Sequence, residues 1–198
     1  MKQKNFAKWT LFLVCVLAIV VALTAISEAT SLVGVGFERT LGAGAVADLI
    51  KQYGGEYILP VQKRLWVEEI FARLVAVTER DDVEYTLTAL NSHEANAVAL
   101  PGGYIFITKG LLNTIGFDGA KLAAVLGHEI AHVEKKHGVN AVLRQMGLTV
   151  LLEVGAMVID FASADLLRLA SATLLQLIQR GWGRDAEYEA DLVGQGLS

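Results

Sequence analysis

The segment His-Glu-Ile-Ala-His at residues 128–132 restricts the fold of this chain more than any other part of the sequence. On a helix, His128 and His132 project from one face on successive turns, so both imidazoles can bind the same metal ion. Glu129 points away from that pair, which leaves its carboxylate available as a general base. The segment therefore predicts a helix that carries two zinc ligands and a catalytic glutamate.

The limits of this helix are visible in the flanking residues. Asp118 has the side chain of an N-cap, residues 119–137 contain no proline, and Gly138 is a natural stop. We therefore expect a helix over residues 119–137. Several of its residues are small enough for another element to approach closely near the metal, namely Ala123, Ala124, Gly127 and Ala131.

A catalytic zinc ion commonly takes three protein ligands, so one more must come from elsewhere in the chain. His137 lies five residues after His132, off the ligand face, and is expected to cap the helix or to support a ligand. Glu187 and Asp191 are a better source because they are four residues apart and share a helix face. One of these carboxylates would bind zinc and the other would orient a ligand histidine, whereas Glu189 would face elsewhere.

The beginning of the chain predicts export. Three lysines within the first eight residues precede an uncharged apolar run from Trp9 to Ile26, which is the layout of a secretory signal or a membrane anchor. The length of the run favours an uncleaved anchor, with cleavage after the small residues near Ser27 as the alternative. We therefore expect residues 1–30 to be the signal or anchor and residues 31–198 to form one domain in the cell envelope, on the periplasmic or extracytoplasmic side.

The charge of the chain gives no case for nucleic-acid binding. The net charge is −4, and the longest basic run is Lys135-Lys136. Recognition of phosphate depends on a positive patch that this sequence lacks.

Hydrophobic periodicity predicts an α+β, mostly helical domain. Helical spacing over residues 41–52 and 61–77 predicts two helices, and alternation over residues 83–90 predicts a strand. A second strand is expected over residues 104–108. The turn residues between the two strands favour a small antiparallel sheet.

The turn before the second strand carries proline and paired glycines. Proline within a strand pattern points to a sheet edge, and such an edge can bind an extended peptide through main-chain hydrogen bonds. The alternative is an ordinary hairpin strand. The predicted substrate-binding residues are Pro101, Gly102, Gly103, Tyr104, Ile105 and Phe106.

Residues 141–180 contain two apolar helical patterns. Charged residues interrupt them at Glu153, Asp160 and Asp165, so no run is long enough to cross a bilayer at low cost. We expect two helices whose apolar faces are buried or lie on lipid.

Five blocks of sequence follow one another in an order and at spacings that are specific together: Asn96-Ala97, Leu100–Tyr104, Gly110–Leu112, Leu122–His132 and Arg184–Asp191. In these blocks the chain resembles the HtpX/BepA-like zinc metallopeptidases, a family that also includes the CaaX prenyl endoprotease. The resemblance covers roughly residues 80–193. It implies a zincin-like fold of the gluzincin type, with a small sheet and an active-site helix.

The resemblance also implies an activity, which is zinc-dependent hydrolysis of polypeptides in envelope protein quality control. Glu129 would be the catalytic acid/base, Asp191 would support the site, and a substrate-binding edge strand would follow Pro101. Arg184 matches the basic residue that precedes the third ligand in the family, and its expected role is structural. One Zn²⁺ per chain would be bound by His128, His132 and Glu187.

The end of the chain raises an alternative. Related enzymes carry a histidine or arginine beyond the third-ligand helix that stabilises the oxyanion, whereas this sequence stops at Ser198. This predicts a domain truncated at its C-terminus, a minimal enzyme with another oxyanion donor, or a fold completed by a protein partner. A catalytically silent, zinc-stabilised binding module or chaperone is the alternative to a peptidase.

Overall fold

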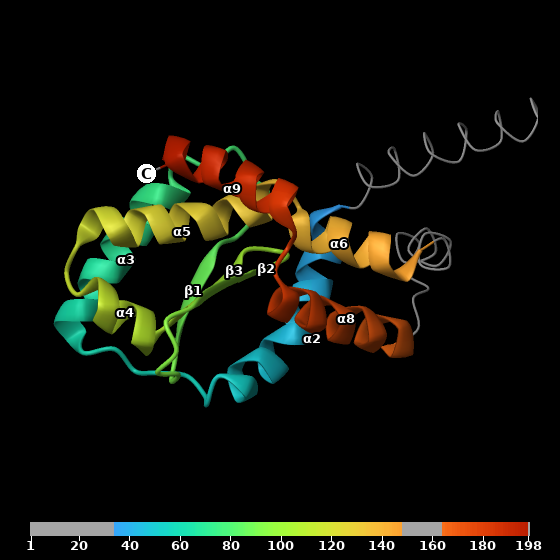
Figure 1. Ribbon diagram of the computed structural model, residues 1–198, viewed down its shortest axis with the longest axis horizontal. Helices are drawn as coiled ribbons and strands as arrows, with labels where there is room; N and C mark the ends of the chain where they lie inside the picture. Colours follow the sequence, from blue (N-terminus) through green and yellow to red (C-terminus); the bar gives the residue numbers. More distant parts are fainter. Residues whose placement is uncertain (1–33, 148–163, 198) are drawn as a thin grey trace, which may run out of the picture.

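The computed structural model describes residues 34–147 and 164–197. They form the predicted α+β, mostly helical domain, in which helices cover both faces of a small sheet (Figure 1). The expected N-terminal anchor and the first apolar helix after residue 147 lie outside these ranges. The elements are α2 (Val35–Gln52), α3 (Val61–Val75), β1 (Thr86–Leu90), β2 (Ala97–Leu100), β3 (Tyr104–Thr108), α4 (Lys109–Ile115), α5 (Gly119–Glu134), α6 (His137–Met146), α8 (Ala164–Arg180) and α9 (Arg184–Leu197).

Within the described ranges, no helix has the length and apolar character needed to span a membrane.

The sheet is mixed rather than antiparallel, and its strand order is β1-β3-β2. The two predicted strands, β1 and β3, pair in parallel, whereas β2 pairs antiparallel with β3. Strand β2 was not predicted, because Ala-Val-Ala-Leu is a short apolar stretch without alternation. The chain reverses once between β1 and β2 and again between β2 and β3, so β1 and β3 run in the same direction.

The prediction that the strand after Pro101 lies at a sheet edge is wrong, because β3 is the central strand. Ile105 and Ile107 pack on one side of the sheet and Phe106 on the other, and all three are buried. Burial on both faces is a property of central strands. The edge strand that lies beside α5, the helix with the two histidines of residues 128–132, is β2.

The paired glycines permit a close approach, as predicted, but to this chain's own backbone. Gly102 and Gly103 have φ angles of 82° and 92°, which favour glycine. A Cβ atom on Gly102 would lie 2.5 Å from Arg39 Cα, and one on Gly103 would lie 2.5 Å from Glu84 O. The turn therefore packs tightly between α2 and the segment that leads into β1.

Two apolar cores lie on opposite faces of the sheet. One joins the sheet to α2, α6 and α8, and Leu41, Leu100 and Leu174 are each fully buried in it. The other joins the sheet to α3, α4 and α5, with Leu126 and Ile130 at its centre. The metal helix α5 is thus held on its inner side by the core.

Helix α5 begins where the sequence predicts and ends three residues earlier. The Asp118 side chain accepts a hydrogen bond from the backbone N–H of Lys121, which confirms it as the N-cap. Lys136 has a left-handed backbone with φ of 54°, and this turn starts a new helix at His137. Gly138 is therefore no stop signal. It is buried in α6, where a Cβ atom would lie 2.9 Å from Pro101 Cγ.

Helices α5 and α9 cross in direct backbone contact, side by side in Figure 1. A Cβ atom on Gly127 would lie 2.9 Å from Gly194 O, and one on Gly194 would lie 2.8 Å from His128 N. Glycine on both helices removes the side chains that would otherwise separate them. The close approach predicted from the small residues of α5 is confirmed at Gly127.

We expect Gly194→Ala to force α9 away from α5, because the added methyl group meets backbone atoms that cannot yield. Overpacking of this kind lowers the free energy of unfolding by about 1–3 kcal/mol. Gly196→Ala is the matched control, since its added Cβ meets no atom within 4 Å. Because alanine has a higher helix propensity than glycine, this control should leave the free energy of unfolding unchanged or raise it by less than about 1 kcal/mol. Urea denaturation measures both, and equal stabilities for the two variants would contradict the crossing.

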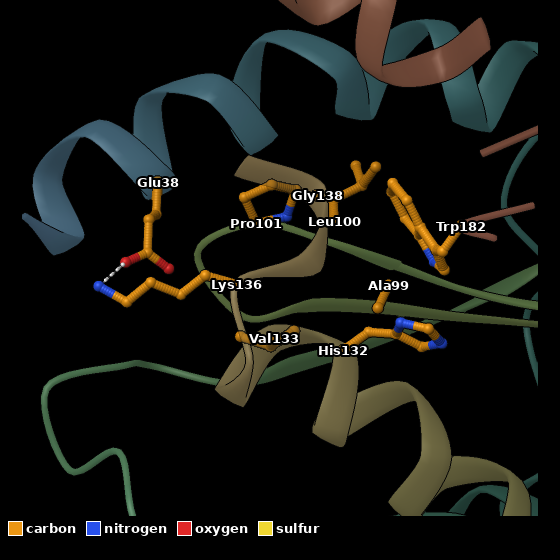
Figure 2. Close-up of a pocket in the computed structure, with 9 residues that line it drawn as sticks. All are labelled: Glu38, Ala99, Leu100, Pro101, His132, Val133, Lys136, Gly138 and Trp182. Atoms are coloured by element: carbon orange, nitrogen blue, oxygen red, sulfur yellow. Dashed lines mark ion pairs between the residues drawn. The ribbon is translucent and has the colours of Figure 1, made fainter. Parts of the chain in front are cut away.

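A buried carboxylate anchors the turn between α5 and α6. Glu38, with 0% exposure, lies 2.8 Å from Arg80 Nη1 and 3.0 Å from Lys136 Nζ. Figure 2 shows the Glu38–Lys136 pair at one end of a small cavity that has His132 at its other end. The ion pairs thereby tie α2 to the turn that follows the metal helix.

Removing one partner of a buried ion pair leaves the other charges uncompensated. We expect Glu38→Gln to lower the free energy of unfolding by about 3 kcal/mol. Glu84→Gln is the control, because its pair with Arg39 is exposed at the surface, and it should cause no measurable change. Thermal and urea denaturation of the two variants test this, and a Glu38→Gln protein as stable as the wild type would refute it.

Candidate metal centre

The structure brings together three side chains from two helices. His128 and His132 project from α5, and Glu187 projects from the first turn of α9. Their ligand atoms lie within 4.8 Å of one another. Residues 59 positions apart along the chain therefore meet at one point, and Glu187, rather than Asp191, supplies the carboxylate.

The spacing of these atoms fits a zinc ion. The Nε2 atoms of His128 and His132 are 3.0 Å apart. Glu187 Oε2 lies 3.3 Å from His128 Nε2 and 3.9 Å from His132 Nε2. A tetrahedral zinc site with bonds of about 2.0–2.1 Å has edges of about 3.3–3.4 Å. Two imidazoles and a carboxylate are also a donor set that zinc accepts, with one position left open.

His128 is oriented by the other carboxylate of α9. Its Nδ1 atom lies 2.9 Å from Asp191 Oδ1. Because Nε2 faces the other ligand atoms, Nδ1 carries the proton and donates to Asp191. This contact agrees with the supporting role expected for Asp191.

His132 is oriented by His137, which in turn contacts Glu189. Its Nδ1 lies 2.8 Å from Nδ1 of His137, and Nε2 of His137 lies 3.3 Å from Glu189 Oε2. With Nε2 of His132 facing the site, its Nδ1–H donates to His137, which in turn donates from Nε2 to Glu189. The support expected from His137 thus has a geometric basis, since the break after Lys136 returns this side chain to the site.

Sequence reasoning missed Glu189. From Glu187 and Asp191 alone, Glu189 was expected to face elsewhere, because residues two apart on a helix point in different directions. That expectation is wrong, because α6 places His137 beside α9 within reach of Glu189. The contact exists because a new helix, α6, begins at His137. No pattern in the sequence predicts that start.

Burial keeps His132 in the form that binds metal. Its side chain is 3% exposed. Burial, together with His128 and His137, lowers the pKa of His132 to about 3. The imidazole is therefore neutral at pH 7, with a lone pair on Nε2.

Glu129 is buried beside the three side chains without joining them. Burial, and in addition the charge of Glu187, raises the pKa of Glu129 to about 8, while a hydrogen bond from the Ala99 backbone acts in the opposite direction. A cation held nearby would lower this pKa again, because opposite charges favour the carboxylate. A carboxyl group with a pKa near neutrality can accept a proton and return it.

The site opens into a cleft between β2 and the α8–α9 connection. The cleft is open to solvent and has a volume of about 210 Å³. Its lining includes residues of β2 and Trp182. Residues of the Pro101–Phe106 segment do not line it, and the strand that borders the cleft is β2.

Arg184 stands at the first position of α9 and is exposed, and it makes no ion pair with another described residue. Its predicted structural role therefore has no contact to support it within these ranges.

The fold and the site together define a zincin-like domain. A model of peptidase family M48 matches residues 61–198. The chain belongs to peptidase family M48.

Several proteins are similar to this chain in sequence. The mitochondrial metalloendopeptidase OMA1 of Schizosaccharomyces pombe is 31% identical over 166 residues, which are 82% of this chain and 47% of that protein. The OMA1 metalloendopeptidase of Bos taurus is 32% identical over 124 residues, or 59% of this chain and 23% of that protein. A putative β-barrel assembly-enhancing protease of Vibrio cholerae is 26% identical over 103 residues, 50% of this chain and 21% of the relative. The chain thus spans less than half the length of these relatives.

The hydrogen bonds that link His132 to His137 and His137 to Glu189 predict that loss of the Glu189 carboxylate weakens metal binding. We expect Glu189→Gln to weaken zinc binding about 10-fold, because partners of this kind are worth about 10–100-fold in affinity. Asp185→Asn is the control, since Asp185 is exposed on the same helix. Competition with a chelator measures both dissociation constants. Identical constants for the two variants would show that Glu189 does not support the site.

Proposed function

We propose that this chain is a zinc-dependent endopeptidase that hydrolyses polypeptides of the cell envelope. The observation that carries the proposal is the convergence of His128, His132 and Glu187, with Glu129 buried beside them, in a chain of peptidase family M48.

Each residue has a distinct part in this proposal. His128, His132 and Glu187 hold one Zn²⁺, which when bound supplies a Lewis acid that lowers the pKa of water and polarises a carbonyl. Glu129 accepts the proton of the attacking water on its carboxylate and later donates it to the departing amine. No covalent bond to the protein forms.

The edge of β2 supports the binding of an extended substrate. The Ala99 backbone N–H reaches Glu129, so this edge runs beside the catalytic carboxylate. A peptide that adds to β2 by main-chain hydrogen bonds would place one of its carbonyl groups near the site. Recognition through the main chain suits a peptidase that accepts varied sequences.

The envelope location rests on the N-terminal sequence pattern and on the family resemblance. Lysines followed by an apolar run predict export of the remaining chain. Two relatives are a mitochondrial metalloendopeptidase and a putative β-barrel assembly-enhancing protease. Misfolded envelope proteins are the substrates we propose.

The role of Glu129 is tested by Glu129→Gln, which removes the proton acceptor and keeps the shape of the side chain. We expect casein cleavage to fall by about 10²–10⁴-fold with zinc content unchanged. Glu134→Gln on the same helix is the control, because its side-chain oxygen can still accept the hydrogen bond from the Glu79 backbone. A zinc-loaded wild-type protein that leaves casein intact would instead favour a binding module.

The third ligand is tested by Glu187→Gln. Loss of the carboxylate removes one of three ligands, so the zinc content after dialysis should fall sharply. Asp185→Asn again serves as the control on α9 and should keep its metal. Atomic absorption on the two purified proteins decides between them, and full zinc occupancy in Glu187→Gln would remove this residue from the ligand set.

A further inference from the structure

Trp182 occupies the connection between α8 and α9. The flanking residues Gly181 and Gly183 have φ angles of 79° and 94°, so the chain takes a sharp path that favours glycine on both sides of the ring. This path turns the indole towards the metal centre. Figure 2 shows the ring beside Ala99 on the same side of the cavity as His132.

Two contacts fix Trp182 relative to the site. Its backbone N–H donates to Glu187 Oε1 at 3.4 Å. Its ring centroid lies 5.8 Å from that of His132, with the two planes tilted by 41°. The indole is therefore held against one proposed ligand while its backbone binds another.

Trp182 also lines the cleft. Trp182 and Ile178 are apolar residues of the cleft lining, which also includes Ala97, Val98 and Ala99 of β2. An extended peptide on the β2 edge would thus pass close to the indole. Trp182 is half-buried, so its ring still has surface that a substrate side chain can cover.

The cleft offers no basic side chain to an acidic side chain of a substrate. Glu129 and Glu187 line it, and no lysine or arginine is among its lining residues. A carboxylate of the substrate would meet no cation there except the bound metal. A large apolar side chain would cover the indole and Ile178 and would remove apolar surface from water.

We propose that Trp182 is a specificity-determining residue that selects substrates with a large apolar or aromatic side chain next to the scissile bond. The inference rests on the proposed peptidase function and adds a substrate class to it. Trp182 acts through contact with the substrate side chain, in addition to its packing on His132.

The test uses quenched fluorescent peptides of one sequence, varied as Phe, Ala or Asp on either side of the scissile bond. In one of the two series, the zinc-loaded full chain should cleave the Phe peptide with a kcat/KM at least about 10-fold above that of the Ala peptide. Trp182→Ala should reduce this ratio to near one, and Trp182→Phe should restore it. Trp66→Phe is the control, because Trp66 packs against Phe117 away from the cleft, and it should keep the wild-type ratio.

The ratio separates selection from damage to the metal site, which would slow all peptides equally. A wild type that cleaves all three peptides alike, or a Trp182→Ala protein that keeps the preference, overturns the inference and leaves the peptidase function standing.

Binding supplies a measurement without turnover. Fluorescence anisotropy of the labelled Phe and Ala peptides on the zinc-loaded Glu129→Gln variant should show the same preference, and the added Trp182→Ala change should abolish it. A binding preference in a protein whose wild type cleaves none of the peptides supports the role of Trp182 while refuting the peptidase function. Equal binding of both peptides to Glu129→Gln counts against Trp182 as the selecting residue.

Discussion

The backbone contact between Gly127 and Gly194 is the constraint on which the rest of the site depends. A side chain on either residue would collide with the opposite helix, so only two glycines allow α5 and α9 to cross this closely. The crossing lies next to His128 and within two helical turns of Glu187. It brings a carboxylate from α9 within 3.3 Å of a histidine on α5. Without it, the two histidines would share a helix face but lack a third ligand.

Hydrogen bonds around the site then restrict what each side chain can do. Asp191 holds one histidine, and the chain from His137 to Glu189 holds the other. Both arrangements place the ring protons on Nδ1 and leave Nε2 for a metal ion. Glu129 lies in a buried position beside β2 and is not part of the group of three ligand atoms. The proposed ligands and the proposed base therefore have different surroundings.

Much of this site could be predicted from local patterns. His128, His132 and the N-cap Asp118 follow from helix geometry, and the resemblance in the Arg184–Asp191 block pointed to Glu187. The position of β3 could not be predicted from its proline and glycines, because those residues fit against Arg39 and Glu84 rather than at an edge. Strand β2 lacked alternation, and Glu189 depended on a turn at Lys136 that has no sequence signal. These features arise from contacts between segments distant in the chain.

The sequence by itself determined that one helix would present two histidines and a glutamate, because a helical repeat places residues four apart on one face and their neighbour on another. It also determined the mostly helical class, through the spacing of apolar residues. Only the tertiary structure decided which strand borders the site, which carboxylates reach which histidine, and that Trp182 lines the cleft. Those outcomes depend on how α9 and β2 pack against α5, and packing is set by complementary shapes that no single segment contains.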